Sequence, residues 1–411
     1  MTMDRRQLLT AGALAVPALA ITGTAQASRG VTTGAEQLAK DGWSRLKGRK
    51  VGVLTNPTGT LKDQTHIVDS MVAAGVRPQA VFGPEHGFRG TAQAGGSEGD
   101  YLDPRTQLPV YDAYGANATK LAGMVTKAGV DTVVFDIADV GARFYTYIWS
   151  MYTAMQAAAI TKAGFVVLDR PNPVGGTAKG PQLDPAYATG VGKKPVVQQH
   201  GMTIGELARF YNQEFLPTDG GAVQQLEVVN VRGWRRDQLD TGLPWIPPSP
   251  NMPTQDTALV YPGTCLFEGT VFSEGRGTTR PFETIGAPDL DWRWAEKLNS
   301  LDLEGVRFRE TYFAPTFNKF QGKTCGGVAL QVTDPHAFDA VRAGVAMIVT
   351  AKALYPNLFA WRPDNWIDKL SGSDRLRKMV DTGASTDDVV NAWQDELKQF
   401  RRTRLPYLRY R

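Results

Sequence analysis

Cysteine and histidine are scarce in this sequence, with two and four residues respectively among 411. A structural zinc site needs several such ligands at short spacing, and the four histidines are scattered, so we expect no metal site. Cys265 and Cys325 are compatible with one disulfide or with two buried thiols, and their spacing does not decide between these states.

The sequence also lacks a strong charge of either sign. Its formal net charge is +4, of which the first 27 residues contribute +1 through Arg5 and Arg6 against Asp4. No cluster of lysine and arginine is interleaved with aromatic residues, so we expect no nucleic-acid partner. The apolar and charged fractions are those of an ordinary globular protein, and 411 residues suffice for two domains with cores of their own.

Apart from the N-terminus, no apolar run reaches the roughly 18 residues that a transmembrane helix needs. Residues 1–27 place Arg5 and Arg6 before an apolar run that ends in Ala25-Gln26-Ala27, which is typical of a signal peptide. The paired arginines favour the twin-arginine route, with an ordinary secretory signal or an uncleaved anchor as alternatives. We therefore expect a protein exported to the periplasm or the extracellular space, with no stable membrane insertion after cleavage.

Several common catalytic and cofactor motifs are absent. No G-x-G-x-x-G follows the first predicted strand, so the sequence favours no dinucleotide cofactor, and no H-E-x-x-H occurs. The stretch GGSEG at 95–99 matches G-x-S-x-G, but glycine-rich loop lies on both sides of it. A nucleophile elbow requires a strand before the serine and a helix after it, which argues against Ser97 as a nucleophile.

Strand-like and helix-like runs alternate from residue 50 onward, which indicates a parallel sheet covered on both faces. The predicted strands are 50–56, 79–86, 131–141, 165–173 and 226–234, and the predicted helices are 60–76, 120–130, 145–164 and 203–215. The pattern changes after about residue 265. We therefore predict an α/β protein with a parallel-sheet domain over 35–265 and a smaller C-terminal α/β domain over 266–411 that completes a cleft.

Residues able to move protons or bind anions follow several predicted strands. Ligands of such sheets bind beyond the carboxyl ends of the strands, so these loops should cluster at one edge. The loop after 79–86 carries Glu85 and His86, and a carboxyl half-screened by apolar neighbours can serve as a general acid. The next two strand ends add Asp136, Asp139, Arg143, Tyr145, Tyr147, Asp169, Arg170 and Asn172. Helix caps and structural ion pairs, such as Glu85 with Arg89 or Asp169 with Arg170, are the alternative interpretation.

The glycine-rich stretch 268–283 is the other concentration of charge. It carries Glu268, Glu274, Arg276, Arg280 and Glu283. A solvated loop is one interpretation, but glycines allow a ligand to approach the backbone closely and arginines bind carboxylates in a bidentate way. Glycoside hydrolysis is the chemistry that uses two carboxyl groups without metal or cofactor, and arginines with aromatic residues would hold an acidic sugar.

Five stretches together resemble one known family. They are TNPTG, GPEHGFRG, FDIADVGARFYTY, DRPNPVGG and FEGTVFSEGRGTTRPFETIGAP, in that order. The sequence is similar over residues 35–411 to the exo-β-N-acetylmuramidases of the NamZ type, glycoside hydrolase family 171, formerly a family of unknown function. The resemblance implies a Rossmann-like catalytic domain, a site between two domains, and release of N-acetylmuramic acid from the non-reducing end of peptide-free peptidoglycan fragments, a MurNAc-GlcNAc substrate.

The resemblance makes Glu85 the predicted catalytic acid, with His86 beside it. It leaves the second catalytic group open among Glu274, Asp136 and Tyr145. We infer that an arginine of SEGRGTTRP pairs with the lactyl carboxylate that distinguishes muramic acid from glucosamine. The predicted substrate-binding residues are Asn56, Arg89, Arg143, Tyr145, Asp169, Arg170, Asn172, Arg276 and Arg280.

Two functions of other classes compete with this interpretation. One is a muropeptide-binding protein without catalysis, for which Glu85→Gln would leave ligand binding intact. The other is a cell-wall esterase or amidase that uses Ser97, for which Ser97→Ala would abolish activity. Neither explains why carboxylates and arginines gather at several strand ends.

Overall fold

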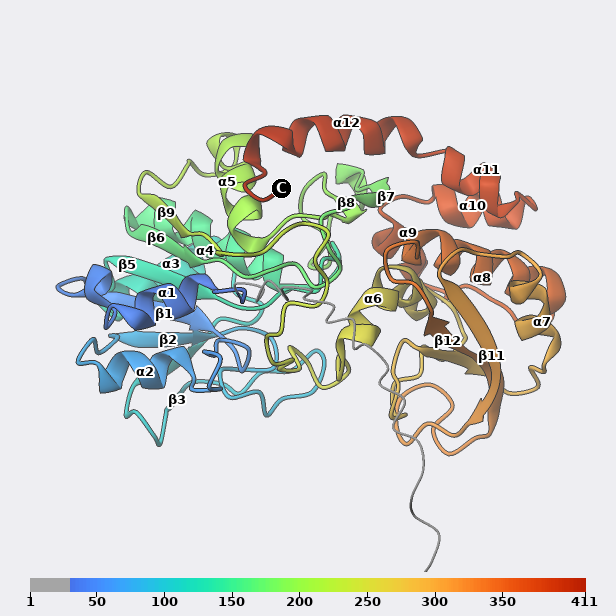
Figure 1. The fold of residues 1–411 in the computed structure, drawn as a ribbon, viewed down its shortest axis with the longest axis horizontal. Helices are drawn as coiled ribbons and strands as arrows, with labels where there is room; N and C mark the ends of the chain where they lie inside the picture. The colour runs from blue at the N-terminus through green and yellow to red at the C-terminus, as the bar shows by residue number, and fades with distance from the viewer. Residues whose placement is uncertain (1–29) are drawn as a thin grey trace, which may run out of the picture.

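The computed structural model describes residues 30–411, so the predicted signal peptide lies outside the described residues. Figure 1 shows two halves side by side, a parallel-sheet domain and a smaller domain built around β11 and β12. No helix of residues 30–411 combines the length and the apolar character that a membrane crossing requires.

The first domain is built on a seven-stranded sheet in the order β3-β4-β2-β1-β5-β6-β9. All neighbouring strands are parallel except β3, which adds an antiparallel edge to β4. Without β3 the order is the 3-2-1-4-5-6 order of a Rossmann sheet, which confirms the predicted fold class. The strands are Val51–Thr55 (β1), Ala80–Gly83 (β2), Tyr101–Leu102 (β3), Pro109–Asp112 (β4), Thr132–Asp136 (β5), Gly164–Leu168 (β6) and Leu226–Val229 (β9).

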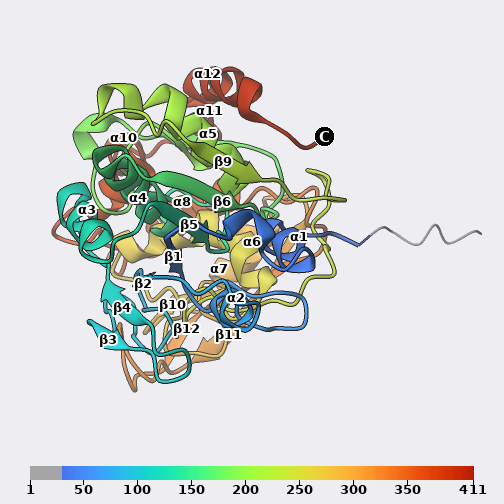
Figure 2. The same ribbon diagram turned by 90° about the vertical axis from the view of Figure 1, so that its left-hand side faces the viewer.

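Helices cover both faces of this sheet because alternate strand side chains point to opposite faces. Val53 and Val81 pack in one core cluster with α1 and α2, whereas Leu54 and Phe82 pack in another with α3, α4 and α5. Figure 2 shows these two groups of helices on opposite sides of the strands. The helices are Gly34–Lys40 (α1), Ile67–Ala73 (α2), Ala118–Lys127 (α3), Tyr147–Thr161 (α4) and Ile204–Glu214 (α5).

The predicted helix over 60–76 is shorter than expected. It begins only at Ile67, because Thr60 pairs with His66 in an isolated bridge and Gln64 takes a positive φ of 66°. The His66 ring then caps the helix by accepting the Val68 amide at 3.2 Å. Strands β3 and β4, and the hairpin of Lys179–Gln182 (β7) with Val197–Gln199 (β8), were not predicted from the sequence.

The smaller domain contains an antiparallel sheet in the order β10-β12-β11. Its strands are Thr284–Ala287 (β10), Val306–Phe313 (β11) and Cys325–Val332 (β12), and its helices are Gln255–Thr264 (α6), Arg293–Asn299 (α7), Ala340–Leu354 (α8), Trp366–Ser371 (α9), Arg375–Asp381 (α10) and Thr386–Asn391 (α11). Helices α6 and α8 meet at Gly263, where a Cβ would lie 1.8 Å from the Ala340 carbonyl oxygen, so only glycine fits there. Cys265 and Cys325 are both buried free thiols.

The C-terminal segment returns from the smaller domain to the sheet domain. Helix α12 (Gln394–Arg404) runs across the top of both halves in Figure 1 and contacts β7. The segment beyond it is anchored on the first domain, where the Tyr410 hydroxyl donates to Asp169 and the Arg236 amide donates to the Arg411 carbonyl oxygen at 3.0 Å. The short 3-10 helices are Ser44–Leu46, Pro185–Tyr187, Leu216–Thr218, Cys265–Gly269 and Leu405–Tyr407.

Candidate active site

Glu85 lies two residues beyond the end of β2, on the edge where the carboxyl ends of the parallel strands meet. Its Oε1 accepts the Gly95 amide at 2.8 Å, and its Oε2 lies 2.8 Å from the Thr146 hydroxyl at the start of α4. A threonine hydroxyl can donate or accept, so the Thr146 contact is compatible with either protonation state of the carboxyl. Among residues 30–411, the Glu85 carboxyl is therefore held by neutral groups.

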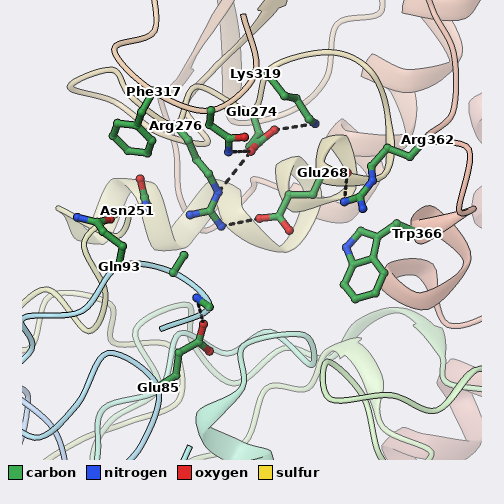
Figure 3. A pocket seen from close by; sticks show the side chains of 13 residues that line it. Glu85, Gln93, Asn251, Glu268, Glu274, Arg276, Phe317, Lys319, Arg362 and Trp366 are labelled. Carbon is green, nitrogen blue, oxygen red and sulfur yellow. Dashed lines mark hydrogen bonds and ion pairs between the residues drawn. The ribbon is translucent and has the colours of Figure 1, made fainter. Parts of the chain in front are cut away.

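The wall opposite Glu85 comes from the smaller domain and is dense in charge (Figure 3). Arg276 lies between two carboxylates, with its Nη2 2.7 Å from Glu268 Oε1 and its Nε 3.3 Å from Glu274 Oε1. Lys319 Nζ lies 2.9 Å from Glu274 Oε2 and also donates to the carbonyl oxygens of Phe267 and Phe272. Two carboxylates and two cations thus share one network.

The two carboxylates of this wall have different surroundings. Glu274 is buried; its Oε1 accepts from Asn318 and is ion-paired with Arg276, and its Oε2 accepts from Lys319. Glu268 is half-buried, and Arg276 donates to Oε1 alone. Burial raises the pKa of the Glu268 carboxyl, with the Arg276 charge opposing the rise and the Glu274 charge adding to it. Glu268 therefore has one oxygen open to a ligand, which Glu274 lacks.

Glu85 and this network line a cavity of about 830 Å³, which we call the large cleft. Its remaining lining comes from the loop after Glu85 and from the smaller domain, namely Gln93, Ala94, Gly95, Asn251, Phe317, Asn318, Arg362 and Trp366. Arg362 is paired with Asp364 at 2.7 Å. A volume of this size is typical of a site for a small ligand.

A second cavity of about 470 Å³ adjoins Glu85, and we call it the side pocket. It shares Glu85 and Trp366 with the large cleft. Helix α4 supplies Trp149, Ser150 and Thr153, its N-cap residue is Thr146, and the loop between β7 and β8 supplies Gly190, Val191 and Lys193. Burial and the Glu85 charge both raise the pKa of Tyr114, another lining residue.

Of the predicted site residues, the structure brings Glu85, Glu274 and Arg276 together in the large cleft. His86 lies outside its lining and is buried with its Nδ1 3.0 Å from the Ala92 carbonyl oxygen, where it shapes the loop. Asp136 also lies outside the lining. It is buried and ion-paired with Arg170, which donates to both of its oxygens, at 2.8 Å to Oδ2.

The other predicted substrate-binding residues also have partners within the protein. Arg89 pairs with Asp69 and Asp103, and Arg280 pairs with Glu283. Arg143 is buried and donates to the carbonyl oxygens of Pro181, Val196 and Leu370. The remainder are buried beside the sheet edge, where Asn56 accepts from Thr58, Asp169 accepts from Thr203, Asn172 donates to Met202, and Tyr145 packs edge-on against Tyr147. None of them lines the large cleft.

Sequence reasoning did not select several residues that line the two cavities. Glu268 was visible as part of the charged stretch 268–283 but was not singled out. Thr146 lies within the stretch FDIADVGARFYTY but was not selected, and Lys193, Lys319, Arg362 and Trp366 lie in segments without a recognisable motif. They reach the site because the fold brings their segments, which are distant in the sequence, next to Glu85.

The described residues lack the arrangements that two other chemistries need. Among residues 30–411, no three or more His, Cys, Asp or Glu side chains are grouped to hold a metal ion. The Ser97 hydroxyl donates to Asp112 at 2.6 Å. A carboxylate contact without an intervening histidine differs from the serine–histidine pair of a serine hydrolase.

Comparison with known proteins gives consistent matches over most of the chain. Residues 51–256 match the family described as exo-beta-N-acetylmuramidase NamZ, N-terminal, and residues 259–410 match its C-terminal counterpart. A Bacillus subtilis protein named peptidoglycan beta-N-acetylmuramidase NamZ is 46% identical over 385 residues, which are 92% of this chain and 91% of that protein.

Two crystal structures of DUF1343 family proteins from Bacteroides fragilis are similar in fold. One is 32% identical with a TM-score of 0.85, and the other is 31% identical with a TM-score of 0.73. Each comparison covers 93% of this chain and 99% of the other. The similarity therefore extends through both domains and the cleft between them.

Proposed function

The chain belongs to the exo-β-N-acetylmuramidase NamZ family and is a glycoside hydrolase, and from this premise we propose how its cleft works. The substrate is a peptidoglycan fragment from whose non-reducing end the enzyme releases N-acetylmuramic acid. The observation that supports this most directly is Glu85 facing the Glu268–Arg276–Glu274 network across the large cleft. This arrangement supplies the two carboxyl groups that glycoside hydrolysis uses.

We assign the proton donor to Glu85. Its Oε2 would give a proton to the oxygen that leaves the N-acetylmuramic acid C1, while the bond between C1 and that oxygen breaks. The Thr146 hydroxyl can accept a hydrogen bond from the protonated carboxyl and donate one to the carboxylate, so it holds Glu85 through both states.

We assign the second carboxyl group to Glu268. Glu274 accepts bonds at both oxygens and Asp136 is committed to Arg170, whereas no donor of residues 30–411 reaches the second oxygen of Glu268. Glu268 would stabilise the positive charge that develops at C1 or activate the incoming water. Arg276 and Lys319 fix the position of this group by neutralising the network around it.

The test compares two substrates, the p-nitrophenyl β-N-acetylmuraminide and the natural MurNAc-GlcNAc disaccharide. Loss of a general acid slows an enzyme by about a hundredfold or more, but p-nitrophenolate leaves without much protonation. We therefore expect Glu85→Gln to lose far more activity on the disaccharide than on the aryl glycoside. Glu268→Gln should lose activity on both substrates alike.

The exposed Glu304 supplies a matched control, and Glu304→Gln should behave as the wild type. The aryl β-N-acetylglucosaminide is the control substrate and should not be cleaved. A wild type that binds peptidoglycan fragments yet cleaves neither muraminide would refute the hydrolase assignment. The reverse pattern between Glu85→Gln and Glu268→Gln would exchange the two roles.

We also propose that the protein is exported, on the basis of the signal-like residues 1–27. Its polymeric substrate lies outside the cytoplasmic membrane, so export would bring the enzyme to it. N-terminal sequencing of the protein recovered from outside the cytoplasm should begin after Ala27. Replacement of Arg5 and Arg6 by lysines should retain it in the cytoplasm if the twin-arginine route is used.

A further inference from the structure

The cations of the large cleft already have carboxylate partners. Arg276 is paired with Glu268 and Glu274, Lys319 with Glu274, and Arg362 with Asp364. An anionic substrate group would have to compete with these internal partners for each of them. The large cleft therefore offers a balanced set of charges rather than a vacant cation.

The side pocket contains a cation of a different kind. Lys193 is partly buried, and its Nζ lies 2.5 Å from the Thr153 hydroxyl. Among residues 30–411 no carboxylate lies within ion-pair distance of it, whereas the neighbouring Lys194 is paired with Asp219 at 2.8 Å. Burial lowers the pKa of Lys193, and the charge of Asp219, which is paired with Lys194, opposes the fall in part.

Helix α4 connects Lys193 with Glu85. Thr146, Trp149, Ser150 and Thr153 follow one another at helical spacing and all line the side pocket. Thr146 contacts Glu85 at one end of this row, and Thr153 contacts Lys193 at the other. Seven residues of helix place the two contacts about 10 Å apart. A single sugar bearing an acidic side arm can extend between two such points.

We propose that Lys193 determines the specificity for muramic acid by binding the lactyl carboxylate in the side pocket. The inference rests on the proposed function, because it takes the glycosidic oxygen to lie at Glu85. The N-acetylmuramic acid ring then occupies the side pocket beside Tyr114 and Trp366, and the remainder of the substrate lies toward the large cleft.

The physical reason is the cost of leaving a buried ammonium group without a carboxylate in direct contact. N-acetylmuramic acid supplies a carboxylate that forms a charge-assisted hydrogen bond with Lys193. N-acetylglucosamine has only a hydroxyl at the same position, so it leaves the ammonium group without that charge. Arg276 and Arg280, the arginines that the sequence favoured for this role, are instead matched by glutamates.

The experiment varies the charge on both partners. Wild type, Lys193→Met and Lys193→Arg are assayed on the aryl muraminide with a free lactyl acid and on the same glycoside with the lactyl group converted to its amide. Lys194→Met is the matched control, because Lys194 lies next in the chain but outside the pocket lining.

We expect wild type and Lys194→Met to prefer the acid over the amide in kcat/KM by about tenfold to a hundredfold, the range for a hydrogen bond to a charged group. Lys193→Met should lose this preference by losing activity on the acid alone, and Lys193→Arg should retain much of it. The change should appear mainly in KM, because the carboxylate binds away from the bond that breaks.

An unchanged preference in Lys193→Met would overturn the inference, and so would a wild type that does not distinguish acid from amide. The second result needs no variant, so it holds even if Lys193→Met fails to fold. A wild type inactive on both glycosides would instead refute the proposed function. The two failures are therefore distinguishable.

Discussion

On the sheet-domain wall of the cleft, Glu85 is held by the Gly95 amide and the Thr146 hydroxyl, both of which are neutral. On the opposite wall, Glu268 and Glu274 are held by the charges of Arg276 and Lys319. A carboxyl held by neutral groups can gain or lose a proton without breaking an ion pair. A carboxylate paired with cations loses that pairing when it is protonated, and at Glu268 the Arg276 charge opposes the rise in pKa that burial causes. The neutral wall therefore suits proton transfer, and the charged wall suits a constant electrostatic environment.

The charged wall should be the most sensitive to mutation. Arg276→Met leaves Glu268 and Glu274 without their shared cation, so we expect about 3 kcal/mol of lost stability and about a hundredfold loss of kcat/KM. Arg280→Met is the matched control from the same loop, because the 58% exposed Arg280 side chain has Glu283 as its one ion-pair partner among residues 30–411. We expect it to cost less than about 1 kcal/mol. Equal losses in thermal melting and turnover for the two variants would contradict the distinction.

The junction between the walls depends on Arg143, which joins the carbonyl oxygens of Pro181 and Val196 to that of Leu370 in the smaller domain. Arg143→Lys cannot reach all three, so we expect about 2 to 3 kcal/mol of lost stability. KM for the disaccharide should stay within about twofold of the wild type, since Arg143 lies outside both cavity linings. A large rise in KM at unchanged melting temperature would restore the substrate-binding role predicted from the sequence.

The loop that carries Glu85 and Gly95 on the neutral wall is anchored by Arg89 and Asp103. Burial alone would raise the pKa of Asp103, but hydrogen bonds from Arg89 and Thr106 hold it at about 2. Its stabilising contribution is therefore complete above the ordinary value of 3.8 and is lost as the pH falls toward about 2. Asp103→Asn should destabilise the protein at pH 7 by about 1 to 2 kcal/mol, and the difference from wild type should shrink below about pH 4 in urea titrations. A difference independent of pH would argue against this ion pair.

The smallest effect should come from Ser97, which lies on the same loop. Ser97→Ala removes one hydrogen bond to Asp112, so we expect about 1 kcal/mol of lost stability and activity within about twofold of the wild type. Treatment with a serine-reactive phosphonate should label neither protein. Labelling together with loss of activity would favour the esterase alternative.

The sheet was predictable from the sequence because its strands are short apolar runs separated by helical patterns, as β1, β5 and β6 show. Glu85 was predictable for the same reason, since it directly follows such a strand. The partners of the charged groups were not predictable. Arg170 and Asp136 follow neighbouring strands, and the sequence does not reveal that they neutralise each other.

Lys193 illustrates the opposite case. It follows Gly192 in a hairpin without a motif, and next to Lys194 it has the pattern of a solvated basic pair. Only the fold shows that Lys194 pairs with Asp219, whereas Lys193 donates to the Thr153 hydroxyl in the side pocket. Charge partners in three dimensions, rather than residue type or spacing, distinguish a structural cation from one that remains available to a ligand.

Helix α12 has a mechanical consequence for the enzyme. It is attached at one end through Glu396 to Arg375 of the smaller domain, and beyond its other end Tyr410 is attached to Asp169 of the sheet domain. The C-terminal segment thereby connects the two domains across the gap between them. Wide opening of that gap would break one of these attachments, so they restrain its width. The binding energy of the sugar is then used for orientation and catalysis instead of for closing the two domains around the substrate.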